Sequence, residues 1–195
     1  KPAKRPSPKP PKDTRPKRLS VTEIKTLIRD PYAIYAKHIL KLKPLRPLHE
    51  SADPLLRGII IHKIFEQFVE NWQQDFSKLD QKNLLLDLTR KQLAEKVASP
   101  TAQLFWFSRV EKIADWFVSE EENRRNLCKP IALEKKGKIV IPSLGFDLTA
   151  QVDRVDINQN GEAVIYDYKT GAVPNKNVQL HFDKQLFFLQ SQAHL

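Results

Sequence analysis

Two strand-like segments joined by an Asn-Gln-Asn-Gly turn constrain the fold of this chain more than any other feature. The segments span residues 146–157 and 163–169, and both are rich in residues that favour strands. A three-residue loop that ends on a left-handed Gly161 would pair residues whose numbers sum to 320. This register predicts that Asp153 lies opposite Asp167.

The predicted hairpin brings several charges to one place. Strand side chains alternate between faces, so Lys169 shares the face of Asp167. Two facing carboxylates repel by about 4 kcal/mol at 4 Å and intermediate dielectric, and a cation must offset this cost. Lys169 alone could neutralise the pair, or a shifted register could leave both acids solvated. The apolar residues of this strand share one face up to Val152, but Val155 belongs to the opposite face. This change predicts a bulge or strong twist at Asp153.

Composition limits the class of protein. With 195 residues and 41% hydrophobic composition, the chain can build one domain with a real core. We expect a soluble, cytoplasmic protein, because no apolar run is long enough to span a bilayer and no secretory leader is visible. Cys128 is the only cysteine, which excludes an intrachain disulfide, a multi-cysteine zinc site and an iron-sulfur cluster held by this chain alone.

The net charge of +10 is concentrated at the N-terminus. Residues 1–18 contain eight basic residues, one acid and six prolines, so they carry +7 of the total. We interpret them as a disordered basic linker, and residues 19–195 as the folded domain. The linker either attaches to a nucleic acid backbone or serves as a solvated tether without a ligand.

The sequence predicts several helices, then a run of strands and a closing helix, and we expect an α/β protein. A capping box formed by Ser20 and Glu23 starts a short first helix, which Asp30 and Pro31 end. Further helices are expected over residues 31–40, 55–72, 79–97, 101–125 and 181–195, and a third strand over 133–141. In the helix at 55–72, one stripe is apolar (Ile60, Ile64, Phe68) and another contains Gly58, His62 and Glu66. A glycine inside a helix makes sense if another backbone or a ligand approaches closely.

Four motifs in this order resemble the RecB-like branch of the PD-(D/E)XK nuclease superfamily. They are Gly58 to His62, Asp153-Arg-Val-Asp156, Asp167-Tyr-Lys169-Thr-Gly171 and Gln185-Leu186. The resemblance implies a restriction-endonuclease-like core, a central mixed β-sheet flanked by helices, preceded by a helical N-terminal region. The opening residues 19–32 are similar to the nuclease domain of AddB-type helicase-nuclease subunits.

The resemblance also implies roles for individual residues. His62, Asp153, Asp167 and the carbonyl of Tyr168 would hold a divalent cation, and oxygen donors suit Mg²⁺, or Mn²⁺ because of the histidine. Lys169 would orient or help deprotonate a water, and Gln185 would position Lys169 or the strand backbone. Supporting roles fall to Gly58, Glu66, Arg154 and Asp156. The implied reaction is phosphodiester hydrolysis.

The expected setting follows from the same resemblance. The substrate would be DNA, with single-stranded ends delivered by a helicase motor, and the partner an AddA-like subunit in double-strand break repair at the bacterial nucleoid, without a membrane. An iron-sulfur cluster is not expected, because Asp30 stands where some members carry a cysteine. Two alternatives remain open: a catalytically silent DNA-binding scaffold, and an exonuclease serving CRISPR adaptation, which the missing cysteines disfavour.

Overall fold

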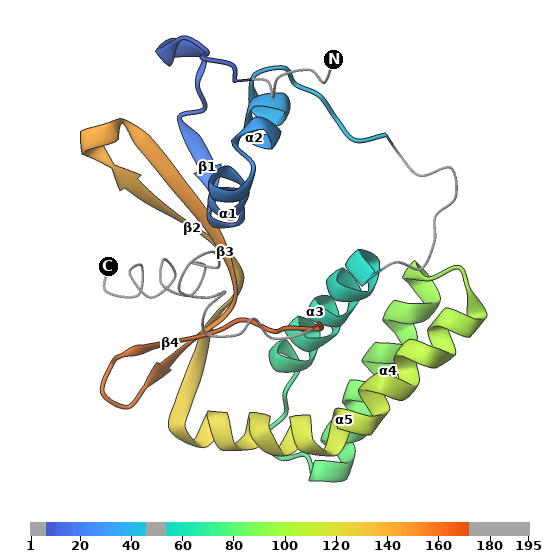
Figure 1. The fold of residues 1–195 in the computed structure, drawn as a ribbon. Helices are drawn as coiled ribbons and strands as arrows, with labels where there is room; N and C mark the ends of the chain where they lie inside the picture. The colour runs from blue at the N-terminus through green and yellow to red at the C-terminus, as the bar shows by residue number, and fades with distance from the viewer. Residues whose placement is uncertain (1–6, 46–53, 172–195) are drawn as a thin grey trace. The chain divides into compact units, whose positions relative to one another are not determined.

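The computed structural model describes residues 7–45 and 54–171 of the chain. Its strands form one mixed sheet in the order β1-β3-β2, with β4 paired to β3 (Figure 1). The described residues divide into two compact units. One contains residues 7–45 and 136–151, and the other contains residues 54–135 and 152–171.

The first unit begins with short elements whose ends are fixed by local chemistry. They are η1 (Lys12–Thr14), β1 (Arg18–Ser20), α1 (Val21–Arg29) and α2 (Pro31–His38). The predicted capping box is confirmed, because the Ser20 hydroxyl accepts the Glu23 N–H while the Glu23 carboxylate accepts the Ser20 N–H. Asp30 caps α2 and Pro31 occupies its first turn, as expected.

A parallel pairing joins β1 to the first half of β3 (Phe146–Asn158). Leu19 pairs with Leu148, and both side chains are buried together with Val21 and Ile34 of the same unit. The preceding strand, β2 (Cys128–Ile141), starts five residues earlier than the sequence predicts. It is linked to β3 through η2 (Pro142–Leu144).

Three helices form the body of the second unit: α3 (Pro54–Glu70), α4 (Lys78–Lys96) and α5 (Pro100–Leu127). The helix α4 packs against both α3 and α5 (Figure 1). The predicted stripe of Ile60, Ile64 and Phe68 is confirmed, since these side chains are at most 2% exposed. None of the described helices is both long and apolar enough to cross a lipid bilayer.

The hairpin follows the predicted register and then stops early. In β4 (Ala163–Tyr166), Ala163 pairs with Ile157 and Tyr166 with Arg154, so the pairs sum to 320 as expected. Gly161 closes the turn with a φ of 81°. The strand ends at Tyr166, however, three residues before the predicted end. The ladder therefore stops one position short of the expected pair of aspartates.

The burial pattern of β3 keeps the same face on both sides of Asp153, where the sequence predicted a bulge or strong twist. Exposure in β3 is lowest at Leu148, Val152, Arg154 and Asp156, which all share one parity. The apolar pattern breaks because a buried arginine and a buried aspartate replace apolar residues on that face. Backbone strain occurs instead on β2, where Glu134 has a φ of 47°.

Candidate metal centre

Three elements of the second unit bring an imidazole and two carboxylates together. His62 comes from α3, Glu134 from β2 and Asp153 from β3. The His62 Nδ1 atom lies 3.2 Å from Asp153 Oδ1 and 3.8 Å from Glu134 Oε1. One donor atom from each residue lies within 4.8 Å of the other two. The donors are therefore close enough to share one cation.

His62 is held in place by the packing of α3. Its neighbours Ile60 and Ile64 are buried in the core, so the helix rotation that buries them turns His62 towards the sheet. The hydrogen bond to Asp153 raises the pKa of His62 against the opposing effect of burial, and a backbone hydrogen bond with Tyr168 adds to the rise. Metal binding requires the neutral imidazole, so a cation must compete with this proton.

Asp153 is the best-anchored acid of the group. Its side chain is 10% exposed. While Oδ1 faces His62, Oδ2 accepts the backbone N–H of Tyr168 at 2.6 Å. The Tyr168 ring packs edge-on against the ring of Phe65 in the core, which fixes the backbone that makes this bond. The carboxylate is therefore oriented before any ligand arrives.

Asp167 and Lys169 lie just beyond the end of β4. Their side chains form an ion pair, with the Asp167 side chain 8% exposed and that of Lys169 38% exposed. The common face that strand alternation predicts for them stays a prediction, because β4 ends at Tyr166. The structure brings His62 and Asp153 together as expected, but the third member of the donor cluster is Glu134 rather than Asp167. A ligand role for Asp167 or for the Tyr168 carbonyl stays a prediction.

Sequence reasoning missed Glu134. It falls inside the strand predicted at 133–141, yet nothing local distinguishes it from the lysines that follow. The available signal was topological, because the strand next to Asp153 carries this acid immediately after the apolar run 131–133. Its left-handed backbone cannot be read from the sequence, and such strain in a non-glycine residue is concentrated at functional sites.

Arg154 and Asp156 follow Asp153 on β3 and are fully buried. The Arg154 guanidinium binds the Asp156 carboxylate in a bidentate manner, at 2.6 and 2.7 Å. It also forms a buried ion pair with Glu121 of α5, a residue that the sequence did not single out. These contacts tie β3 to α5 next to Asp153 in the sequence, and a supporting role for both residues in the site stays a prediction.

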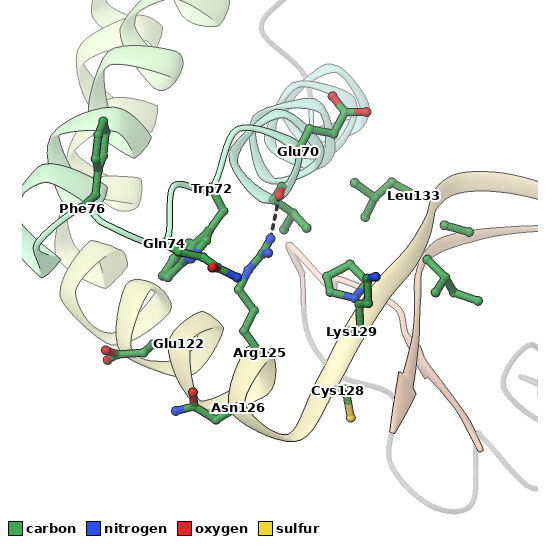
Figure 2. Close-up of a pocket in the computed structure, with 14 residues that line it drawn as sticks. Glu70, Trp72, Gln74, Phe76, Glu122, Arg125, Asn126, Cys128, Lys129 and Leu133 are labelled. Atoms are coloured by element: carbon green, nitrogen blue, oxygen red, sulfur yellow. Dashed lines mark hydrogen bonds between the residues drawn. The ribbon is translucent and has the colours of Figure 1, made fainter. Parts of the chain in front are cut away.

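Arg125 extends this network to α3. It binds Glu121 at 2.6 Å and donates to the backbone carbonyl of Val69 at 2.6 Å, the bond dashed in Figure 2. Its guanidinium also lies 5.1 Å from the ring centre of Trp72. Beside it lies a pocket of about 960 Å³ where the ends of α3 and α5 meet the start of β2. Of the predicted site residues that the structure describes, none lines this pocket.

Three predicted site residues remain: Glu66, Gly58 and Gln185. Glu66 forms an ion pair with Lys63 at 2.5 Å. A Cβ atom on Gly58 would meet the Thr170 hydroxyl at 3.6 Å, an ordinary contact, so the described residues show no close backbone approach there. Gln185 lies outside the described residues, as does the helix predicted around it.

Comparison with known proteins places the chain in a family. The chain belongs to the PD-(D/E)XK nuclease superfamily, whose family model matches residues 18–193. The mixed sheet with its flanking helices agrees with the restriction-endonuclease-like core predicted above.

Similar sequences occur in uncharacterized proteins of Rickettsia. One from Rickettsia conorii is 32% identical over 177 residues, which cover 88% of this chain and 21% of that protein. One from Rickettsia bellii is 33% identical over 174 residues, with the same coverage of both chains. One from Rickettsia typhi is 30% identical over 166 residues, 83% of this chain and 19% of that protein. The chain thus spans about a fifth of the length of the curated relatives it matches.

Proposed function

We propose that this chain is a divalent-metal-dependent deoxyribonuclease domain that hydrolyses phosphodiester bonds. The observation that carries the proposal is the convergence of His62, Glu134 and Asp153 within 4.8 Å, in a member of a nuclease superfamily. Two carboxylates and one imidazole fit Mg²⁺ or Mn²⁺, because oxygen donors suit hard cations and imidazole favours Mn²⁺ between the two. The donor set therefore matches the metals that such chemistry uses.

Some residues of the chain would hold the cation, and Lys169 would act on the reacting groups. His62, Asp153 and either Glu134 or Asp167 would hold the cation, with the Tyr168 carbonyl as a further donor. When bound, the cation supplies Lewis acidity at the scissile phosphate and lowers the pKa of a water. Lys169, which pairs with Asp167, would orient that water and offset charge in the transition state.

Buried ion pairs would hold these groups in position. The Arg154 pairs with Asp156 and Glu121 fix the strand that carries Asp153. Gln185 is proposed to position Lys169 or the backbone near it. A site held by buried ion pairs on helices and strands is more sharply positioned than one on loops alone.

We further propose a RecB-like, AddB-type domain that cuts single strands delivered by a helicase motor during double-strand break repair. The order of the four motifs supports this, as does a basic segment suited to join a motor domain. The relatives are about five times as long as the matched region, which leaves chain for other domains. The proposed setting is the bacterial nucleoid, with an AddA-like partner and no iron-sulfur cluster.

A cleavage assay on end-labelled single-stranded DNA with Mg²⁺ tests the activity. We expect Asp167→Ala and Lys169→Ala to lower the rate by about 100-fold or more, because each removes a charge at the reacting centre. Lys91→Ala, which removes an exposed charge on α4, is the matched control. Cleavage that survives both substitutions would contradict the proposal. Salt-dependent DNA binding without cleavage under any divalent metal would instead support the silent scaffold.

A further inference from the structure

The first unit contains a basic groove that the proposed hydrolysis does not use. It has a volume of about 660 Å³ and lies between the start of α1 and the neighbouring parts of β2 and β3. Arg18, Lys136 and Lys138 provide its charge. We propose that this groove binds the sugar-phosphate backbone of DNA. The inference rests on the proposed function, for which it supplies a substrate-binding surface.

The charges of the groove are unbalanced. Its lining includes three cations and, among the described residues, no acid. Arg18 and Lys136 are exposed, and neither forms an ion pair within residues 7–45 and 54–171. Lys138 lies 3.4 Å from Asp147, but both side chains are solvent-accessible and such a pair is worth little. The groove therefore presents a local positive field to an anionic ligand.

Polar groups between the cations suit phosphate oxygens. The hydroxyls of Ser20, Thr22 and Thr149 and the amide of Gln151 line the same groove. Side chains of these types make many of the phosphate contacts in protein–DNA complexes. The groove also receives the N-terminus of α1, whose capping carboxylate on Glu23 is already bound by Lys37 at 2.7 Å and does not line the groove.

The described part of the groove lining favours nucleic acid over a protein partner. Among the described lining residues, Val21 is buried and Ala150 is small, so they offer no pocket for the aromatic or aliphatic side chains that dominate protein–protein interfaces. The basic segment before β1 also extends the field. Its Lys17 carbonyl accepts the Asp147 N–H at 2.8 Å, which anchors that segment next to the groove.

Binding measured without cleavage isolates this surface. The full 195-residue chain is titrated with one fluorescent oligodeoxynucleotide, single-stranded and then as a duplex, in EDTA at several salt concentrations. The test variant is Arg18→Ala with Lys136→Ala. The control is Lys91→Ala with Lys112→Ala, which removes the same charge from exposed helical positions. Lys136→Glu alone serves as a second variant if loss of Arg18 disturbs β1, and circular dichroism reports the fold.

We expect the test variant to lower affinity by roughly tenfold or more at 0.1 M salt. The slope of log affinity against log salt should fall by about 1.4 for the single strand and about 1.8 for the duplex, since two phosphate contacts are lost. The control should change neither value. Equal effects of the two double variants, or none, would overturn the inference, as would polyglutamate binding as tightly as DNA with the same sensitivity. Because the assay contains no metal, an inactive nuclease that still shows the groove effect would refute only the proposed function.

Discussion

The candidate metal centre depends most on Asp153. One of its oxygens faces His62 and the other accepts a backbone N–H, so its orientation is fixed from two sides. Glu134 differs from it, because its side chain is 25% exposed and its backbone is strained. We infer that Asp153 provides the fixed ligand position and Glu134 a more adaptable one.

Replacing Glu134 with glutamine tests this division at the level of one residue. The substitution keeps the size of the side chain but removes a negative charge next to the cation. We expect Mn²⁺ affinity to fall by about tenfold or more. Calorimetric titration of Mn²⁺ measures it, with Glu95→Gln on the exposed end of α4 as the control. Equal affinities of the two variants would exclude Glu134 from the site.

Glu23 makes the first unit sensitive to acid. Burial tends to raise its pKa, but hydrogen bonds from Lys37, the Ser20 N–H and His38 outweigh this and lower the pKa to about 2. A carboxyl whose pKa is lowered by folding stabilises the protein above its unfolded pKa of about 4.5, and this contribution is lost as the pH falls towards 2. The expected contribution is about 2 kcal/mol, after allowance for the exposed Lys37 side chain.

The variant Glu23→Gln isolates that contribution. At pH 7 it should be less stable than the wild type by about 2 kcal/mol, and at pH 2 the two should unfold alike. Urea unfolding at a series of pH values measures the difference. A gap that stays constant across the whole range would show that packing, rather than charge, accounts for the effect.

Individual helices and turns show how much of the fold the sequence predicts. The caps of α1 and α2 and the turn at Gly161 follow from short-range chemistry, and the structure confirms each of them. The end of β4 and the strain at Glu134 depend on how separate segments pack. The local sequence therefore does not predict them. Arg154 and Asp156 break the apolar periodicity of β3 because they are buried as an ion pair, and Arg154 has a second buried partner, Glu121, that is distant in the sequence.

The buried ion pairs should stabilise the junction of α5 and β3. Glu121→Gln removes one carboxylate from Arg154, leaving a buried guanidinium with less compensation. We expect a loss of about 3 kcal/mol in the free energy of unfolding. Asp115→Asn, which breaks the exposed pair with Lys82, should cost less than about 1 kcal/mol. Urea unfolding at pH 7 compares them, and similar losses would mean that the network adds nothing beyond a surface pair.

Two glycines should respond in opposite directions to alanine. Gly161→Ala forces a side chain into a left-handed conformation and should destabilise the chain by about 1 to 2 kcal/mol. Gly58→Ala meets only an ordinary contact and should stabilise α3 by about 0.5 to 1 kcal/mol. Thermal unfolding measures both changes. Destabilisation by Gly58→Ala would show that something does approach the helix closely there.

In the whole molecule, the family match and most of the net charge fall on different parts of the chain. The family model spans residues 18–193, while residues 1–18 alone carry +7 of the net charge. Motif order predicted the family, because four short patterns fall in sequence on suitable elements. The basic groove escaped prediction, since it combines residues 18–22 with residues 136–151 that only the fold brings together.

Diffraction from crystals soaked in Mn²⁺ would locate the cation. We expect one anomalous peak at coordination distance, about 2 to 2.5 Å, from His62 Nδ1 and Asp153, with Glu134 or Asp167 completing the protein donors. The same crystals of Asp153→Asn should show a weaker peak or none. A wild-type map without a peak between His62 and Asp153, at a Mn²⁺ concentration that supports cleavage, would show that these residues do not form the metal site.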